Sequence, residues 1–193
     1  MLSKNKEEKN RLVGKNNQKN RTIMTNFIKI ILLLFIPISM QSQQSKKLSK
    51  SKVDYTSFLE LSEEILDYRQ ERLIPLETFL EYASEENTIV LDTRSETAFK
   101  QKHLKGAMHI NFSDFTDKKL AKKIPLKDTR ILIYCNNNID GDRIHFASKK
   151  TPLALNIPTF INLYGYGYKN VYELSSLVPI KDQRLQFEGT SVK

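Results

Sequence analysis

The chain has 193 residues, one cysteine and a formal net charge of +9, from 31 Lys and Arg against 22 Asp and Glu. The positive charge is concentrated in residues 1–52, which hold 12 Lys and Arg and 2 Glu, whereas residues 53–193 hold 19 against 20. A nucleic-acid-binding domain carries its basic surface on the folded part, so this distribution excludes that class.

Residues 1–42 are expected to form a basic leader with a secretory signal peptide. The apolar run Ile30–Ile38 follows Lys29 and a stretch rich in Lys and Arg. It is shorter than the about 20 apolar residues that span a bilayer, and this arrangement is typical of a signal peptide. We therefore expect a periplasmic or secreted protein. An uncleaved signal segment that anchors the chain is the alternative, and Met24 is an alternative start.

The polar segment 43–53 is expected to be a linker, and residues 54–193 to form one domain. Residues 54–72 carry apolar side chains at three-to-four-residue spacing, which predicts an amphipathic helix. A second helix is predicted over 76–83, followed by a buried strand over 88–91. Ser95 is typical of the residue that caps a short helix, here one that runs to Lys102.

The rest of the chain continues to alternate strands and helices. Strands are predicted over 107–110, 131–134 and 171–174, and helices over 113–123 and 156–163. Gly165–Gly167 ends the last helix. This alternation predicts an α/β domain with a mainly parallel sheet.

Cys135 directly follows the predicted strand over 131–134. In an open parallel sheet, functional groups gather just beyond the carboxyl ends of the strands. Exported proteins usually pair their cysteines, but a single cysteine has no partner for an internal disulfide. Cys135 is therefore either a small buried apolar residue or a nucleophile.

Between residues 73 and 174 the sequence resembles the rhodanese-like family. The matching segments are Asp92-Thr-Arg94, Ala98-Phe99 with His103-Leu-Lys-Gly-Ala107, Ile133-Tyr-Cys135, and Leu163-Tyr-Gly-Tyr-Gly-Tyr-Lys-Asn-Val171. The resemblance implies a three-layer α/β fold, with a central parallel sheet of about five strands and helices on both faces. It also implies that Cys135 accepts a sulfane sulfur as a persulfide and passes it to a nucleophile, as in a thiosulfate-type sulfurtransferase.

The residues after Cys135 give this chemistry a physical basis. A thiolate rather than a thiol attacks, and backbone N–H groups ahead of a helix stabilise both a thiolate and an anionic donor. We therefore expect the backbone amides of Asn136, Asn137 and Asn138 to surround the sulfur and Arg143 to be a candidate for contact with the anion.

Three further residues of the resemblance are expected to have structural roles. Asp92 and Arg94 are expected to brace loops at the strand ends, because buried charges need partners. His103 is expected to form a structural hydrogen bond, because one histidine without a nearby partner is not a catalytic constellation.

The segment 136–155 is longer than the corresponding loop of the family pattern. The nearest arginine, Arg143, lies eight positions beyond Cys135 instead of five, and Asp140 and Asp142 intervene. Negative charge raises the pKa of a thiol. The alternative is therefore a non-catalytic rhodanese-type module that binds a small ligand or a protein through this loop. A rhodanese-related phosphatase ranks third, because a phosphoryl dianion needs a close arginine.

No cofactor or metal is expected, because the three histidines lack ligand spacing. The stretch from Asn136 to Gly141 imitates the start of a calcium loop, but Ala147 stands where the bidentate Glu is required. The expected partner is a small sulfur-containing anion, or a persulfide donor or acceptor. Nucleic acid is excluded, and a membrane is involved only through an uncleaved leader.

Overall fold

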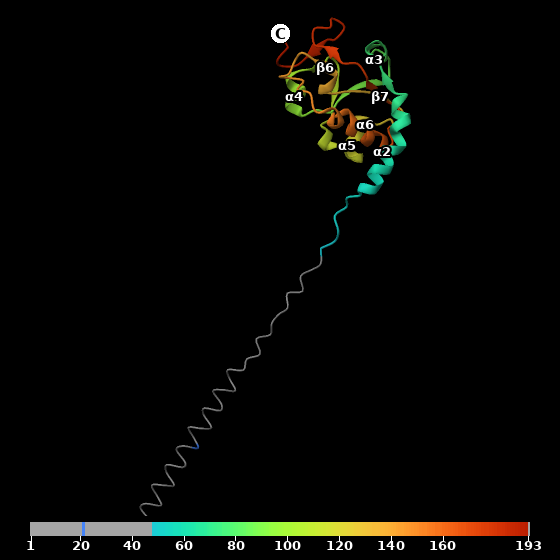
Figure 1. Cartoon of the computed structure of the whole chain (residues 1–193), viewed down its shortest axis with the longest axis vertical. Helices are drawn as coiled ribbons and strands as arrows, with labels where there is room; N and C mark the ends of the chain where they lie inside the picture. The colour runs from blue at the N-terminus through green and yellow to red at the C-terminus, as the bar shows by residue number, and fades with distance from the viewer. Residues whose placement is uncertain (1–20, 22–47, 193) are drawn as a thin grey trace, which may run out of the picture. The chain divides into compact units, whose positions relative to one another are not determined.

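A computed structural model describes Arg21 and residues 48–192 of the chain (Figure 1). The chain divides into two units, residues 1–51 and 52–193, and the second holds all the elements considered below. The predicted leader lies outside the described residues apart from Arg21. Residues 48–53 of the predicted linker contain no helix or strand.

A central sheet of five strands forms the middle layer of the second unit, in the order β1-β7-β5-β2-β4. All four pairs of neighbouring strands are parallel. The strands are β1 Leu73–Ile74, β2 Thr88–Asp92, β4 Met108–His109, β5 Arg130–Tyr134 and β7 Val171–Leu174. The predicted α/β class and parallel sheet are confirmed. Because the strands are parallel, their carboxyl ends meet at one edge.

Helices cover both faces of this sheet (Figure 1). One apolar cluster joins the sheet to α2 Tyr55–Gln70, α5 Asp117–Lys123 and α6 Asn156–Gly165. A second cluster lies on the opposite face and includes α3 Leu76–Ala83. Side chains of β5 alternate between the two clusters, as the period of two in a strand requires. The predicted three-layer arrangement is therefore confirmed.

Several short elements complete the unit. The helix α4 is Glu96–Gln101, and 3-10 turns occur at Phe112–Asp114, Asn136–Asn138 and Thr151–Leu153. Two small ladders pair β3 His103–Leu104 with β9 Phe187–Glu188, and β6 Ile139–Asp140 with β8 Val178–Pro179. The patterns did not predict these ladders, because two residues are too few to show a period.

Most predicted helix boundaries agree with the structure, with one exception. The helix predicted over 113–123 begins only at Asp117, after a 3-10 turn. The Thr116 hydroxyl accepts a hydrogen bond from the Lys119 backbone N–H at 3.3 Å and so fixes the later start. The predicted cap at Ser95 is confirmed, since its hydroxyl accepts from Ala98 N–H at 3.3 Å.

The N-terminal helix α2 packs against α6. Ile65 of α2 is buried in the cluster shared with α6, and the Tyr68 ring meets the Tyr164 ring edge to face at 5.1 Å. A Cβ added at Gly165 would lie 3.0 Å from Leu61 Cδ2, so glycine permits the close approach of the two helices. Within the described part of the chain, no helix has the length and apolar character needed to span a bilayer.

Candidate functional site

Cys135 lies at the carboxyl end of β5 and is 1% exposed. It follows the alternation of the strand, so its side chain lies on the sheet face that α6 covers. Its backbone begins the 3-10 turn Asn136–Asn138. The predicted position beyond a central strand is therefore correct, and the thiol is closed off from solvent.

Backbone N–H groups from two segments favour the anionic form of the Cys135 thiol. One comes from Asn137 in the turn after Cys135, and the others come from Asn156 and Leu155 at the start of α6. Burial raises the pKa of the Cys135 thiol above its usual value, these N–H groups lower it, and the Glu173 carboxylate raises it. The net direction of the Cys135 pKa is upward, which favours the neutral thiol over the thiolate.

A set of buried amide side chains lies beneath the thiol. The Cys135 N–H donates to Asn138 Oδ1 at 2.9 Å, and Asn156 Nδ2 donates to the same oxygen at 3.0 Å. Asn156 Nδ2 also donates to Glu173 Oε1 at 3.2 Å. Asn138 Nδ2 donates to the Leu174 carbonyl at 2.7 Å, which ties the turn to β7.

The first two asparagines after Cys135 hold the loop 136–155 through their side chains. Asn136 Nδ2 donates to the Ala147 carbonyl at 2.9 Å. Asn137 Nδ2 donates to the Lys149 carbonyl at 2.7 Å, and Asn137 Oδ1 accepts from the Lys149 N–H at 3.0 Å. We call these three hydrogen bonds the asparagine strap. The strap closes the loop on itself beside the buried thiol.

The middle of the loop is fixed to α4 and β3 by charged groups. Asp142 pairs with Lys102 Nζ at 3.0 Å and with His145 Nδ1 at 2.9 Å. Burial acts to raise the pKa of Asp142, but hydrogen bonds from Lys102 and His145 outweigh it and hold the pKa at about 2. Phe146 is buried, and the Arg94 guanidinium carbon lies 4.4 Å from its ring centroid.

Asp92 and Arg94 form a buried pair at the end of β2, with 2.6 Å between Arg94 Nη2 and Asp92 Oδ2. Arg94 also donates to the carbonyls of His145 at 3.0 Å and Lys102 at 2.7 Å. The Tyr134 hydroxyl donates to Asp92 Oδ2 at 2.6 Å. Burial and the Asp92 charge keep the pKa of Tyr134 well above its usual value. This cluster braces the loop, and it lies on the α3 side of β5, whereas Cys135 lies on the α6 side.

The structure places two other predicted residues away from these contacts with the thiol. Arg143 is exposed on the loop and lines a cavity of about 350 Å³ formed by the loop's own residues, from Ile139 to Ser148. His103 stacks on Phe99 with 3.7 Å between ring centroids, and its Nδ1 lies 2.7 Å from the Phe99 carbonyl oxygen.

Sequence reasoning missed Leu155, Asn156 and Glu173. The start of a helix at Asn156 was predicted, but the sequence did not reveal that a loop of this length returns the helix to Cys135. Glu173 carried a signal, because an acidic residue in an otherwise apolar strand needs a partner.

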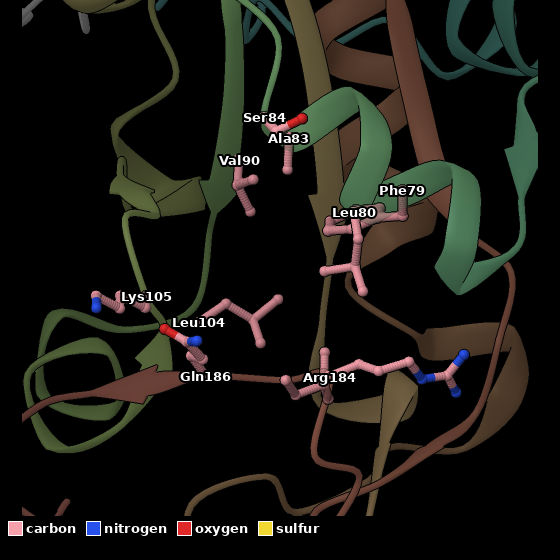
Figure 2. Close-up of a pocket in the computed structure, with 10 residues that line it drawn as sticks. Phe79, Leu80, Ala83, Ser84, Val90, Leu104, Lys105, Arg184 and Gln186 are labelled. Atoms are coloured by element: carbon pink, nitrogen blue, oxygen red, sulfur yellow. The ribbon is translucent and has the colours of Figure 1, made fainter.

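A separate cavity of about 410 Å³ lies on the α3 face (Figure 2). Leu80, Val90 and Leu104 point into it, while the charged ends of Lys105 and Arg184 point away. The cavity is therefore lined mainly by apolar side chains. Cys135 lies on the other face of the sheet. Nowhere in residues 48–192 do three or more His, Cys, Asp and Glu side chains gather as a metal site would require.

Comparisons with known proteins found one matching family and several similar solved structures. Residues 76–176 match the family described as rhodanese-like domain. The Alr3790 protein from Anabaena sp. is 20% identical over 60% of this chain and 81% of its own, with a TM-score of 0.41. A rhodanese with anions from E. coli is 20% identical over 53% and 98%, with a TM-score of 0.35. The BH2092 protein from Bacillus halodurans is 18% identical over 67% and 86%, with a TM-score of 0.44. No curated protein matches.

Proposed function

The chain belongs to the rhodanese-like domain family, because more than half of the chain, residues 76–176, matches that family, and on that basis we propose that the chain carries sulfane sulfur as a persulfide on Cys135. The observation that carries the proposal is the place of one buried thiol at the end of a central strand, where it begins the 3-10 turn Asn136–Asn138 and where backbone N–H groups of Asn137, Leu155 and Asn156 favour its anionic form. Such donors stabilise a sulfur anion in a site without water.

The proposed reaction has two steps. In the first, the Cys135 thiolate attacks the outer sulfur of thiosulfate, a new S–S bond forms, and sulfite leaves with the electron pair of the broken bond. In the second, an acceptor thiolate attacks the terminal persulfide sulfur, and Cys135 leaves as a thiolate. Both steps conserve charge and need no oxidant or cofactor. The proton of the resting thiol is lost to solvent before the first step.

The loop 136–155 must open for this reaction, because Cys135 is 1% exposed. Its closing contacts are the Asp142 pairs with Lys102 and His145 and the asparagine strap, which consists of neutral hydrogen bonds at the surface. Each hydrogen bond of the strap contributes about 1 kcal/mol, so opening of the strap side of the loop is accessible without unfolding the domain.

A non-catalytic binding module is the second candidate function. It is favoured by the closed loop, which buries the thiol and raises its pKa, and by the exposure of Arg143, Lys149 and Lys150 on the outer side of the loop. In that case the loop would contact a small ligand or a protein, and Cys135 would serve packing alone.

The proposed location is outside the cytoplasm, through the signal peptide expected in residues 1–42, with a membrane anchor as the alternative. The proposed partners are small sulfur-containing anions and persulfide donors or acceptors.

Intact mass spectrometry after incubation with thiosulfate or a polysulfide tests the sulfur-carrier function. A gain of one sulfur atom that dithiothreitol removes is expected for the wild type, and none for Cys135→Ser. An equal gain in both proteins, or no gain in the wild type, would leave the binding module as the function.

A further inference from the structure

Glu173 is a buried acid on β7 whose carboxylate joins the N-terminal helix to the site. It is 7% exposed. Its Oε2 accepts a hydrogen bond from Arg69 Nε at 2.7 Å and lies 2.6 Å from Arg69 Nη2 in an ion pair, and its Oε1 accepts from Asn156 Nδ2 at 3.2 Å. A charge-assisted hydrogen bond from a guanidinium to a carboxylate fixes the positions of both groups more firmly than a neutral hydrogen bond does.

A continuous series of hydrogen bonds runs from this pair to the cysteine. Asn156 Nδ2 contacts both Glu173 and Asn138 Oδ1, and Asn138 Oδ1 accepts from the Cys135 N–H. The backbone N–H of Asn156 is also one of the donors to the thiol. Asn156 therefore receives its orientation from Glu173, and its backbone N–H favours the anionic form of the Cys135 sulfur.

Arg69 lies on α2, outside the region 76–176 that matches the family. The geometry points to Arg69 as a positioning residue for Cys135: it holds the Glu173 carboxylate and offsets its charge, and through Glu173 it orients the Asn156 and Asn138 groups around the sulfur. This inference rests on the proposed function in that Cys135 is the reacting group.

The other charged groups near the site are paired with each other or exposed, so Arg69 is the group that offsets the charge of Glu173. The Glu173 carboxylate disfavours the thiolate, and Arg69 is the cation that contacts that carboxylate. Asp92 and Arg94, at the end of the adjacent strand β2, pair with each other at 2.6 Å. Lys149 and Lys150, on the loop, are exposed to solvent, where their charges are screened. Without Arg69, the charge of Glu173 would act on the sulfur unopposed.

An NMR titration of the single cysteine, labelled with ¹³C at Cβ in the full chain, tests the role of Arg69. The label gives one signal, because the chain has one cysteine. The titration midpoint of Cys135 is expected to rise in Arg69→Gln by at least about half a pH unit, about threefold in the ionisation constant. It is expected to fall in Glu173→Gln, and the double variant is expected to behave like Glu173→Gln. Arg69→Lys is expected to restore part of the wild-type value.

The matched control is Arg130→Gln, which removes the pair between Arg130 and Glu85 at the start of β5, the strand that precedes Cys135. It should leave the midpoint unchanged. A merely structural role of Arg69 would shift the unfolding temperature without ordering the midpoints by charge. Equal midpoints in wild type, Arg69→Gln and Glu173→Gln would overturn the inference. If Arg69→Gln does not fold, the comparison of the Glu173→Gln midpoint with that of the wild type decides it. The titration requires no sulfur transfer, so a protein that forms no persulfide but shows the expected order refutes only the proposed function.

Discussion

Lys102 and Asp142 are 40 positions apart in the sequence, and their charged groups meet at 3.0 Å. The contact attaches the middle of the loop 136–155 to the end of α4, while the asparagine strap closes the part nearer to α6. Access to Cys135 therefore depends on two separate sets of contacts, one charged and one neutral.

Lowering the pH should release the charged contact. The pKa of Asp142 is about 2 in the folded protein, below the unfolded value of about 3.9. The pair therefore contributes stability above about pH 4 and loses it as the pH falls toward 2. Hydrogen exchange of the His145 N–H, which donates to Asp142 at 3.1 Å, should accelerate over that range relative to the intrinsic exchange rate of an unprotected amide at the same pH. In Asp142→Asn this acceleration should be absent, and an unchanged profile would contradict the assignment.

Substituting Asn137 by Ala should open the strap. The change removes two of its three hydrogen bonds, and each contributes about 1 kcal/mol. The closed loop should lose about 1–2 kcal/mol, so iodoacetamide should alkylate Cys135 about fivefold to thirtyfold faster at fixed pH. Asn136→Ala removes one bond and should have the smaller effect. An alkylation rate equal to that of the wild type in Asn137→Ala would show that access depends on other contacts.

Leu155→Pro should remove one donor to the sulfur without bending the chain. Leu155 has φ −64°, which suits proline, and Ala154 has the extended ψ of 135° that a residue before proline prefers. The loss of one hydrogen bond to the thiolate should raise the Cys135 pKa and slow persulfide formation about fivefold at pH 7. Leu155→Ala keeps the N–H and serves as the control. Equal rates in the two variants would exclude Leu155 as a donor.

Asp92→Asn should destabilise the domain strongly. Arg94 is 3% exposed, so the substitution leaves a buried guanidinium without its countercharge. The expected loss is about 3–5 kcal/mol in the free energy of unfolding, measured by urea denaturation. Glu96→Gln breaks the exposed pair with Lys100 and should cost less than about 0.5 kcal/mol. Similar losses in the two variants would contradict the account of the buried pair.

The sequence predicted the sheet well because its strands carry strong local signals. The run Arg130–Tyr134 and the segment Thr88–Asp92 are short, apolar and bounded by polar residues, and both are strands of the sheet. The two-residue strand β1 and the delayed start of α5 were missed, because tertiary pairing and one hydroxyl cap decide them.

The position of Cys135 was also predictable, whereas its surroundings were not. Its place after β5 follows from local sequence, but Leu155, Asn156 and Glu173 reach it only through the course of the loop 136–155 and the register of β7. Likewise, the side chains of Asn136 and Asn137 turn to Ala147 and Lys149, a pairing that composition does not encode.

The packing of α2 on α6 means that the homologous region and the folding unit have different boundaries. A truncated protein that starts at residue 76 would keep every residue of the family match but lose Ile65, which is 2% exposed, and the edge strand Leu73–Ile74. The apolar side of α6 and the free edge of β7 would then face water, and both favour aggregation. Recombinant work on this protein should therefore begin no later than Asp54, whose side chain caps α2.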